Sequence, residues 1–111
     1  MISWVFFGCE KPDSILKIYV KDTKGIVIAD ASVSLVSSVS SSIKMTPHAS
    51  KDNTDGLGVA VFNLNDFFKA QSSEGRDGYF DVSVTKESMT GVASQVRTTM
   101  NTTQVQTIYI K

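Results

Sequence analysis

The sequence has few of the residues on which most enzyme chemistry depends. It contains one cysteine, Cys9, and one histidine, His48, which excludes an intrachain disulfide and a zinc site built only from Cys and His. Eleven Lys and Arg balance eleven Asp and Glu, so no excess positive charge favours nucleic acid. We therefore expect no nucleic-acid partner, no metal and no cofactor.

Long apolar runs are also missing, since no stretch of about 18 apolar residues occurs that could form a transmembrane helix. What is present is a globular composition, with 41% hydrophobic residues, 20% charged residues and two prolines in 111 residues. This length corresponds to one domain of ordinary size. We place the folded domain at residues 14–111.

The first nine residues, MISWVFFGC, are uncharged and mostly apolar, and the polar run EKPDS follows them directly. This segment resembles the last part of a bacterial lipoprotein signal, in which a small residue, here Gly8, precedes the cysteine that receives lipid. The polar run looks like the tether of a Bacteroidetes-type surface lipoprotein. The resemblance implies a truncated signal and tether over residues 1–13, with lipidation at Cys9. The alternative is an apolar N-terminal strand in which Cys9 is a small buried side chain.

From Ser14 onward the apolar residues alternate with polar ones, which indicates half-buried strands with one solvent-exposed face. Leu16, Ile18 and Val20 form the first such set, and Gly25 follows in a turn. The other inward positions that we predict from alternation or weaker patterns are Ala31, Val33, Leu35, Phe80, Val82, Val84, Val92, Val96, Ile108 and Ile110.

Five segments have a different pattern. Residues 57–64 are apolar at every second position on both faces, which predicts a strand covered on both sides. Residues 65–70 predict one helical turn, with Phe67 or Phe68 folded onto the core. A short strand is expected at 43–46 and ends before Pro47, whereas residues 48–56 and 71–78 read as polar loops.

The strands carry a family resemblance over roughly residues 15–110. The segments DTKGIVIADASVSL (22–35), TDGLGVAVF (54–62) and GYFDVSV (78–84) are similar to motifs of carboxypeptidase-regulatory-like and transthyretin-like (prealbumin-like) domains. The resemblance implies an all-β fold, a seven-stranded antiparallel Ig-like or transthyretin-like β-sandwich. It also implies a non-catalytic accessory role, although fold alone does not determine function.

Sites for chemistry are weakly supported. His48 follows a proline in a polar segment without a nucleophile-elbow motif, so a solvated imidazole is expected there. Asp52, Asn53 and Asp55 do not have the spacing of a calcium loop. Glu74, Asp77 and Asp81 are expected to be solvated. Residues 13–15, Asp-Ser-Ile, resemble the acceptor motif of Bacteroidetes O-glycosylation.

Two functions follow as hypotheses. The first is a non-catalytic accessory or assembly domain of a secreted, lipid-anchored bacterial surface protein, located in the cell envelope, at the outer membrane or outside the cell. Its partner would be a protein or glycan at the cell surface, and it would touch membrane only through the lipid on Cys9. The second is a carbohydrate- or peptide-binding module. Its candidate contact aromatics are Tyr19, Phe67, Phe68 and Tyr109.

Overall fold

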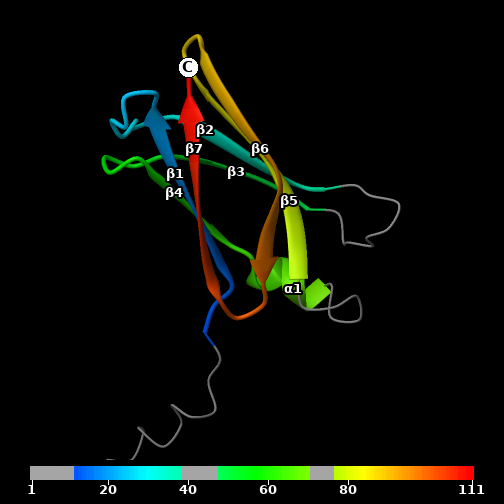
Figure 1. The fold of residues 1–111 in the computed structure, drawn as a ribbon. Coiled ribbons are helices and arrows are strands. Elements are labelled where there is room, and N and C mark those ends of the chain that lie inside the picture. Colours follow the sequence, from blue (N-terminus) through cyan, green and yellow to red (C-terminus); the bar gives the residue numbers. More distant parts are fainter. Residues whose placement is uncertain (1–11, 39–47, 71–76) are drawn as a thin grey trace, which may run out of the picture.

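The structure, a computed structural model, describes residues 12–38, 48–70 and 77–111 and is all-β apart from one short helix (Figure 1). Its strands form two sheets, in the orders β4-β1-β7 and β3-β2-β5-β6. This arrangement is consistent with a β-sandwich. The elements are β1 (Ile15–Asp22), β2 (Ser32–Ser37), β3 (Ala49–Asn53), β4 (Val59–Asn63), α1 (Asn65–Ala70), β5 (Asp77–Lys86), β6 (Met89–Thr99) and β7 (Thr103–Ile110).

The core is built from the alternating apolar positions of the strands. Leu16, Ile18 and Val20 of β1 are fully buried, as the period of two predicts. The predicted inward residues of the other strands are also buried, with the exception of Val92: Ala31, Val33, Leu35, Phe80, Val82, Val84, Val96, Ile108 and Ile110. Burial of one such aliphatic or aromatic side chain stabilises the fold by about 1.5–3 kcal/mol.

The prediction for residues 57–64 is wrong in one respect. Ala60 and Phe62 of β4 are buried, but Val61 is 47% exposed and Leu57, which lies before the strand, is 73% exposed. β4 ends its sheet, and its outward side chains face away from the core. Apolar residues on both faces of a strand therefore do not imply a second covering layer here.

The polar segment 48–56, expected as a loop, contains β3, which pairs antiparallel with β2 from Val36↔Ala49 to Ser32↔Asn53. Backbone pairing does not require apolar side chains, so this strand has no hydrophobic signal. The expected strand at 43–46 lies outside the described residues. Of the loop expected at 71–78, Asp77 and Gly78 belong instead to β5, and residues 71–76 lie outside the described residues.

A β-bulge explains the wrong prediction for Val92. The register of β5 against β6 shifts between Phe80 and Val82, and Gln95 has a φ of 54°. An extra residue in one strand reverses which side chains face inward beyond it. Val96 is thus buried, whereas Val92, four residues earlier, is 75% exposed.

The β1–β7 pair departs from the expected antiparallel sandwich. β7 runs parallel to β1, from Ile15↔Thr103 to Asp22↔Ile110, so this sheet is mixed. β7 also approaches β6 of the other sheet, since Thr90 and Lys111 exchange two backbone hydrogen bonds of 3.2 Å. Gly91 lies at this contact, where a Cβ would be 2.6 Å from the Tyr109 carbonyl oxygen.

The segment 54–58, which carries part of the family resemblance, acts as a structural clamp. The buried Thr54 hydroxyl accepts a hydrogen bond from Ala31 N (2.9 Å) and donates one to Ile28 O (2.7 Å). Asp55 Oδ1 accepts hydrogen bonds from the backbone of the same turn. Gly58 completes it with a φ of +76°. The Thr54 hydrogen bonds connect the turn before β4 to the segment that leads into β2.

Gly58 should therefore be intolerant of a side chain. A Cβ at Gly58 would lie 2.9 Å from Val27 Cβ and 3.0 Å from Val20 O, whereas Gly25, with a φ of +86°, has nothing within 4 Å. Gly25→Ala should cost about 1–2 kcal/mol from its left-handed backbone alone. Gly58→Ala should lower the free energy of unfolding by about 1–3 kcal/mol more than Gly25→Ala does, because the added methyl group overpacks this site. Urea unfolding followed by circular dichroism tests this prediction. Equal losses of unfolding free energy in the two variants would contradict the close packing around Gly58.

Candidate functional site

Phe67 and Phe68 of α1 are both buried at 2% exposure, so they offer no exposed ring to a ligand. The Phe67 ring packs edge-on against Phe68 and Phe80, with centroids 4.9 Å apart in each pair. The helical turn is confirmed, and both aromatics, rather than one, fold onto the core. The expectation that these two side chains contact a ligand is corrected, because the short helix turns them inward.

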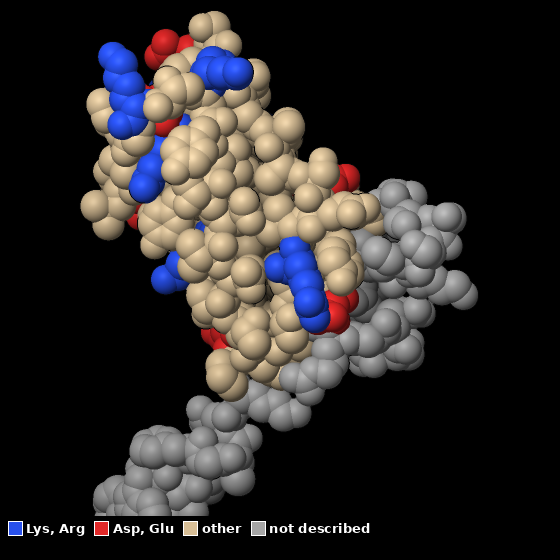
Figure 2. Space-filling model, viewed as in Figure 1, with Lys and Arg blue, Asp and Glu red and all other residues tan. Residues whose placement is uncertain are grey.

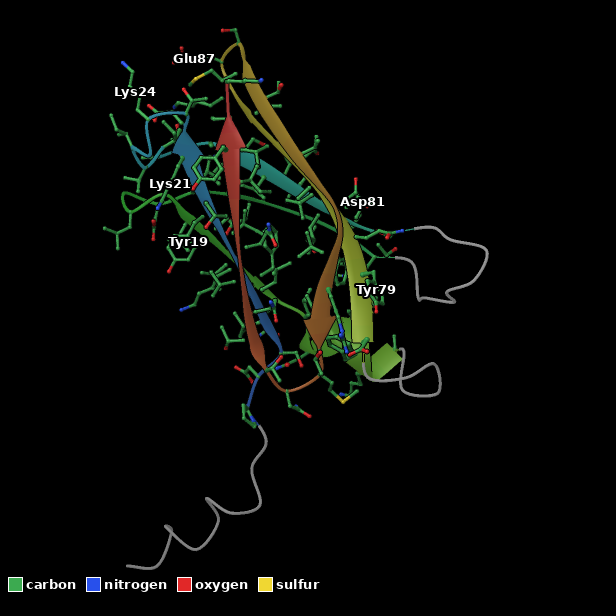
Figure 3. The ribbon with its side chains drawn as sticks, in the orientation of Figure 1. Tyr19, Lys21, Lys24, Tyr79, Asp81 and Glu87 are labelled. Carbon is green, nitrogen blue, oxygen red and sulfur yellow. The ribbon has the colours of Figure 1, made fainter. Side chains whose placement is uncertain are left out.

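Tyr19 and Tyr109 lie on the outward face of the β4-β1-β7 sheet. Tyr109 is 58% exposed and Tyr19 is half-buried. The parallel register pairs Lys21 with Tyr109 and Tyr19 with Thr107, so the two rings come from diagonal positions on adjacent strands. Figure 3 shows Tyr19 and Lys21 on the same side of the molecule. Of the four predicted contact aromatics, the structure leaves these two at the surface.

His48 lies just before β3 and its ring packs edge-on against Phe67 and Phe80, with centroids 5.6 and 5.9 Å away. Its Nε2 is 2.6 Å from Ser50 Oγ. Burial lowers the pKa of His48 below its usual value of 6.5. The imidazole is therefore a partly desolvated neighbour of the aromatic core, and not the solvated side chain that the sequence predicted.

Residues 12–14 are held at one end of the sheets, whereas Cys9 and the two residues after it lie outside the described residues. Ser14 N donates to Asn65 Oδ1 (2.8 Å), and Asn65 Nδ2 donates to Asp13 Oδ1 (2.9 Å). Asn101 Nδ2 donates to Pro12 O (2.9 Å). We call residues 12–14 with these partners the N-terminal clamp. A cavity of about 470 Å³ beside it is lined by the same residues and by Phe68, Lys69 and Met100.

The N-terminal clamp also includes Ser14, the serine of the candidate glycosylation motif. Ser14 is 2% exposed and its Oγ accepts a hydrogen bond from Asn101 N at 2.8 Å. A glycan on this oxygen would have to replace that bond and leave a buried environment. The folded domain therefore does not present Ser14 as an acceptor.

The carboxylates take part in local structure. Asn53 Nδ2 donates to Asp30 Oδ1 (3.1 Å), and Arg97 lies 3.0 Å from Asp77. Asp81 Oδ1 accepts from Ser38 Oγ and from Gln95 N, which holds the bulge. Within the described ranges no group of three His, Cys, Asp or Glu side chains could hold a metal ion. Glu74 lies outside those ranges.

The comparisons with known proteins add no identity. No protein-family description matches the chain, and a comparison with curated proteins finds no match. The resemblance to transthyretin-like domains thus rests on the quoted residues. In the part of the chain that the structure describes, none of the helices has the length and apolar character needed to cross a bilayer.

Sequence reasoning missed the exposed aliphatic side chains at the turns. Ile26, Val27 and Leu57 are all exposed, and they lie in the segments that follow β1 and precede β4. Large apolar residues directly beside turn glycines, as in Lys24-Gly25-Ile26 and Gly56-Leu57-Gly58, were the available signal.

The lowered pKa of His48 predicts a pH dependence of stability. Because the unfolded chain binds the proton more readily than the folded one, the contribution of His48 is complete above about pH 6.5 and is lost as the pH falls toward the lower folded pKa. The melting temperature of the wild type should fall more steeply than that of His48→Gln between about pH 8 and pH 5. Other titrating groups are common to both proteins. Parallel curves would refute this role of His48.

Proposed function

We propose that this chain is a non-catalytic accessory or assembly domain of a secreted, lipid-anchored bacterial surface protein. Its attachment is Cys9, and its work is done by surface contacts with a protein or glycan of the cell envelope. The observation that carries the proposal is the N-terminal clamp, in which side chains of Asn65 and Asn101 hold Ser14 and Pro12, at the end of the polar run that follows Cys9. A lipid at Cys9 would then pull on a defined end of the domain.

We also propose a particular type of β-sandwich for the fold. A seven-stranded Ig-like or transthyretin-like sandwich is supported by the alternating cores of β1, β2 and β5 and by the Thr54 clamp. The parallel β1–β7 pair distinguishes this chain from a purely antiparallel version. The proposed absence of catalysis is supported by the sequence around the one histidine, His48, which has no nucleophile-elbow motif.

Acylation at Cys9 is tested on protein produced from its native locus. We expect the N-terminal peptide to begin at Cys9, with the mass of attached acyl chains, and the protein to partition into the detergent phase. Cys9→Ala should move the protein to the aqueous phase and leave its melting temperature unchanged, because the folded domain is placed after residue 13. Retention of Met1 with a free thiol at Cys9 would refute the lipid anchor.

The second candidate function is a carbohydrate- or peptide-binding module, and the exposed Tyr109 beside Lys21 favours it. If this surface stacks on sugar rings, Tyr19→Ala with Tyr109→Ala should weaken binding to a responsive glycan by about tenfold, since an aromatic contact contributes about 0.5–1.5 kcal/mol. Tyr79→Ala, on β5, serves as the control. Titration of a glycan panel without binding at about millimolar concentration, the weak end of specific affinity, would eliminate the module.

A further inference from the structure

One surface carries most of the exposed apolar side chains of the described residues. It consists of the outward face of the β4-β1-β7 sheet together with the two turns beyond the end of β1. Lys17 pairs with Val61 on one side and Val105 on the other, and paired residues share a face. Of eight exposed large hydrophobics, this surface holds six: Ile26, Val27, Leu57, Val61, Val105 and Tyr109. We call it the β1 surface.

The two turns form a single apolar tip on the β1 surface. Val27 forms a bridge with Lys21, and a Cβ at Gly58 would touch the Val27 side chain at 2.9 Å. The turn that carries Ile26 is thus packed against the turn that carries Leu57. These two side chains are 58% and 73% exposed. Each extends from a turn, so together they form a protruding apolar group and do not line a groove.

The β1 surface carries three lysines and, in its two turns, two carboxylates. Lys17, Lys21 and Lys24 have no ion-pair partner among the described residues. The nearest turn carboxylates, Asp22 and Asp55, accept hydrogen bonds from backbone N–H groups of their own turns. Figure 2 shows most of the visible Lys and Arg side chains toward the upper left, with acidic atoms among them, beside a broad area of uncharged residues.

The apolar tip and the lysines together favour one kind of binding partner for the β1 surface over the others. A second copy of the chain would place lysines against lysines, because the turn carboxylates Asp22 and Asp55 are already hydrogen-bonded within their own turns. A small ligand that is enclosed on several sides would need a concave site, whereas this surface is a sheet face with two exposed turns. Aliphatic side chains at a tip, flanked by lysines and tyrosines, match the layers of a lipid bilayer with negative headgroups.

We propose that the β1 surface docks on an anionic phospholipid bilayer. Ile26 and Leu57 enter the boundary between headgroups and acyl chains, and Tyr109 lies at headgroup level. Lys21 and Lys24 contact the phosphates. The sequence alone predicted membrane contact only through Cys9, and this second contact is independent of acylation there.

The test uses the unacylated full chain and phospholipid vesicles, either phosphatidylcholine alone or phosphatidylcholine with phosphatidylglycerol. Co-sedimentation should show binding to the anionic vesicles that weakens several-fold between about 0.1 M and 0.5 M salt. Ile26→Ser with Leu57→Ser should lower the partition coefficient about tenfold. Lys21→Glu with Lys24→Glu should lower it at least as much, because each lysine changes sign.

Matched controls lie on the other sheet and the helix. Val36→Ser with Val92→Ser removes two exposed valines from the outward face of β2 and β6, and Lys51→Glu with Lys69→Glu reverses two exposed lysines. Both controls should leave partitioning within about twofold, since neither pair lies on the β1 surface. Circular dichroism melting of every variant verifies that these exposed substitutions preserve the fold.

Three outcomes would overturn the proposal. In the first, surface and control variants partition equally, which would assign any binding to residues common to all, including the apolar segment 1–9. In the second, neutral and anionic vesicles bind alike without salt dependence. In the third, the chain is a dimer in sedimentation velocity and Ile26→Ser with Leu57→Ser makes it monomeric, which would assign the surface to a second copy. None of these results bears on acylation of Cys9, so the two proposals fail separately.

Discussion

The structure depends on the burial of one face of β1. This strand is the middle of its sheet, with β4 antiparallel on one side and β7 parallel on the other. Its inward residues, Leu16, Ile18 and Val20, are fully excluded from solvent. Because side chains alternate across a strand, the same constraint exposes Lys17, Tyr19 and Lys21 on the opposite face. The core and the proposed docking surface are thus two sides of one strand.

Both ends of β1 are fixed by polar contacts. At its start, Ser14 exchanges hydrogen bonds with Asn65 and Asn101, which come from α1 and the turn before β7. At its end, Asp22 caps its own turn, and Thr54 ties the 28–31 segment to the turn before β4. A buried hydroxyl needs a partner, and these residues have theirs within the fold. The acidic turn at Asp55 therefore stabilises the chain before β4. Ser14 of the Asp-Ser-Ile motif likewise fixes the start of β1.

The candidate site residues fall into two groups, those that take part in the fold and those that lie at the surface. The aromatic cluster of Phe67, Phe68 and Phe80 takes part in the core and extends to His48. Desolvation by this cluster lowers the pKa of His48. By contrast, Lys17, Lys21 and Lys24 have no ion-pair partner among the described residues. Most of the exposed large apolar side chains of the described residues lie on the same surface as these lysines.

The sequence by itself determined the all-β class, the inward residues of β1, β2, β5 and β7, and the short helix after β4, because strand alternation and helix capping are local rules. Tertiary structure alone decided the rest. The bulge opposite Phe80 and Val82 reversed Val92, backbone pairing made a strand of residues 49–53, and the parallel approach of β7 to β1 joined Tyr109 to Lys21. These outcomes depend on which segments meet in space, and the periodicity of a single segment carries no information about its partners.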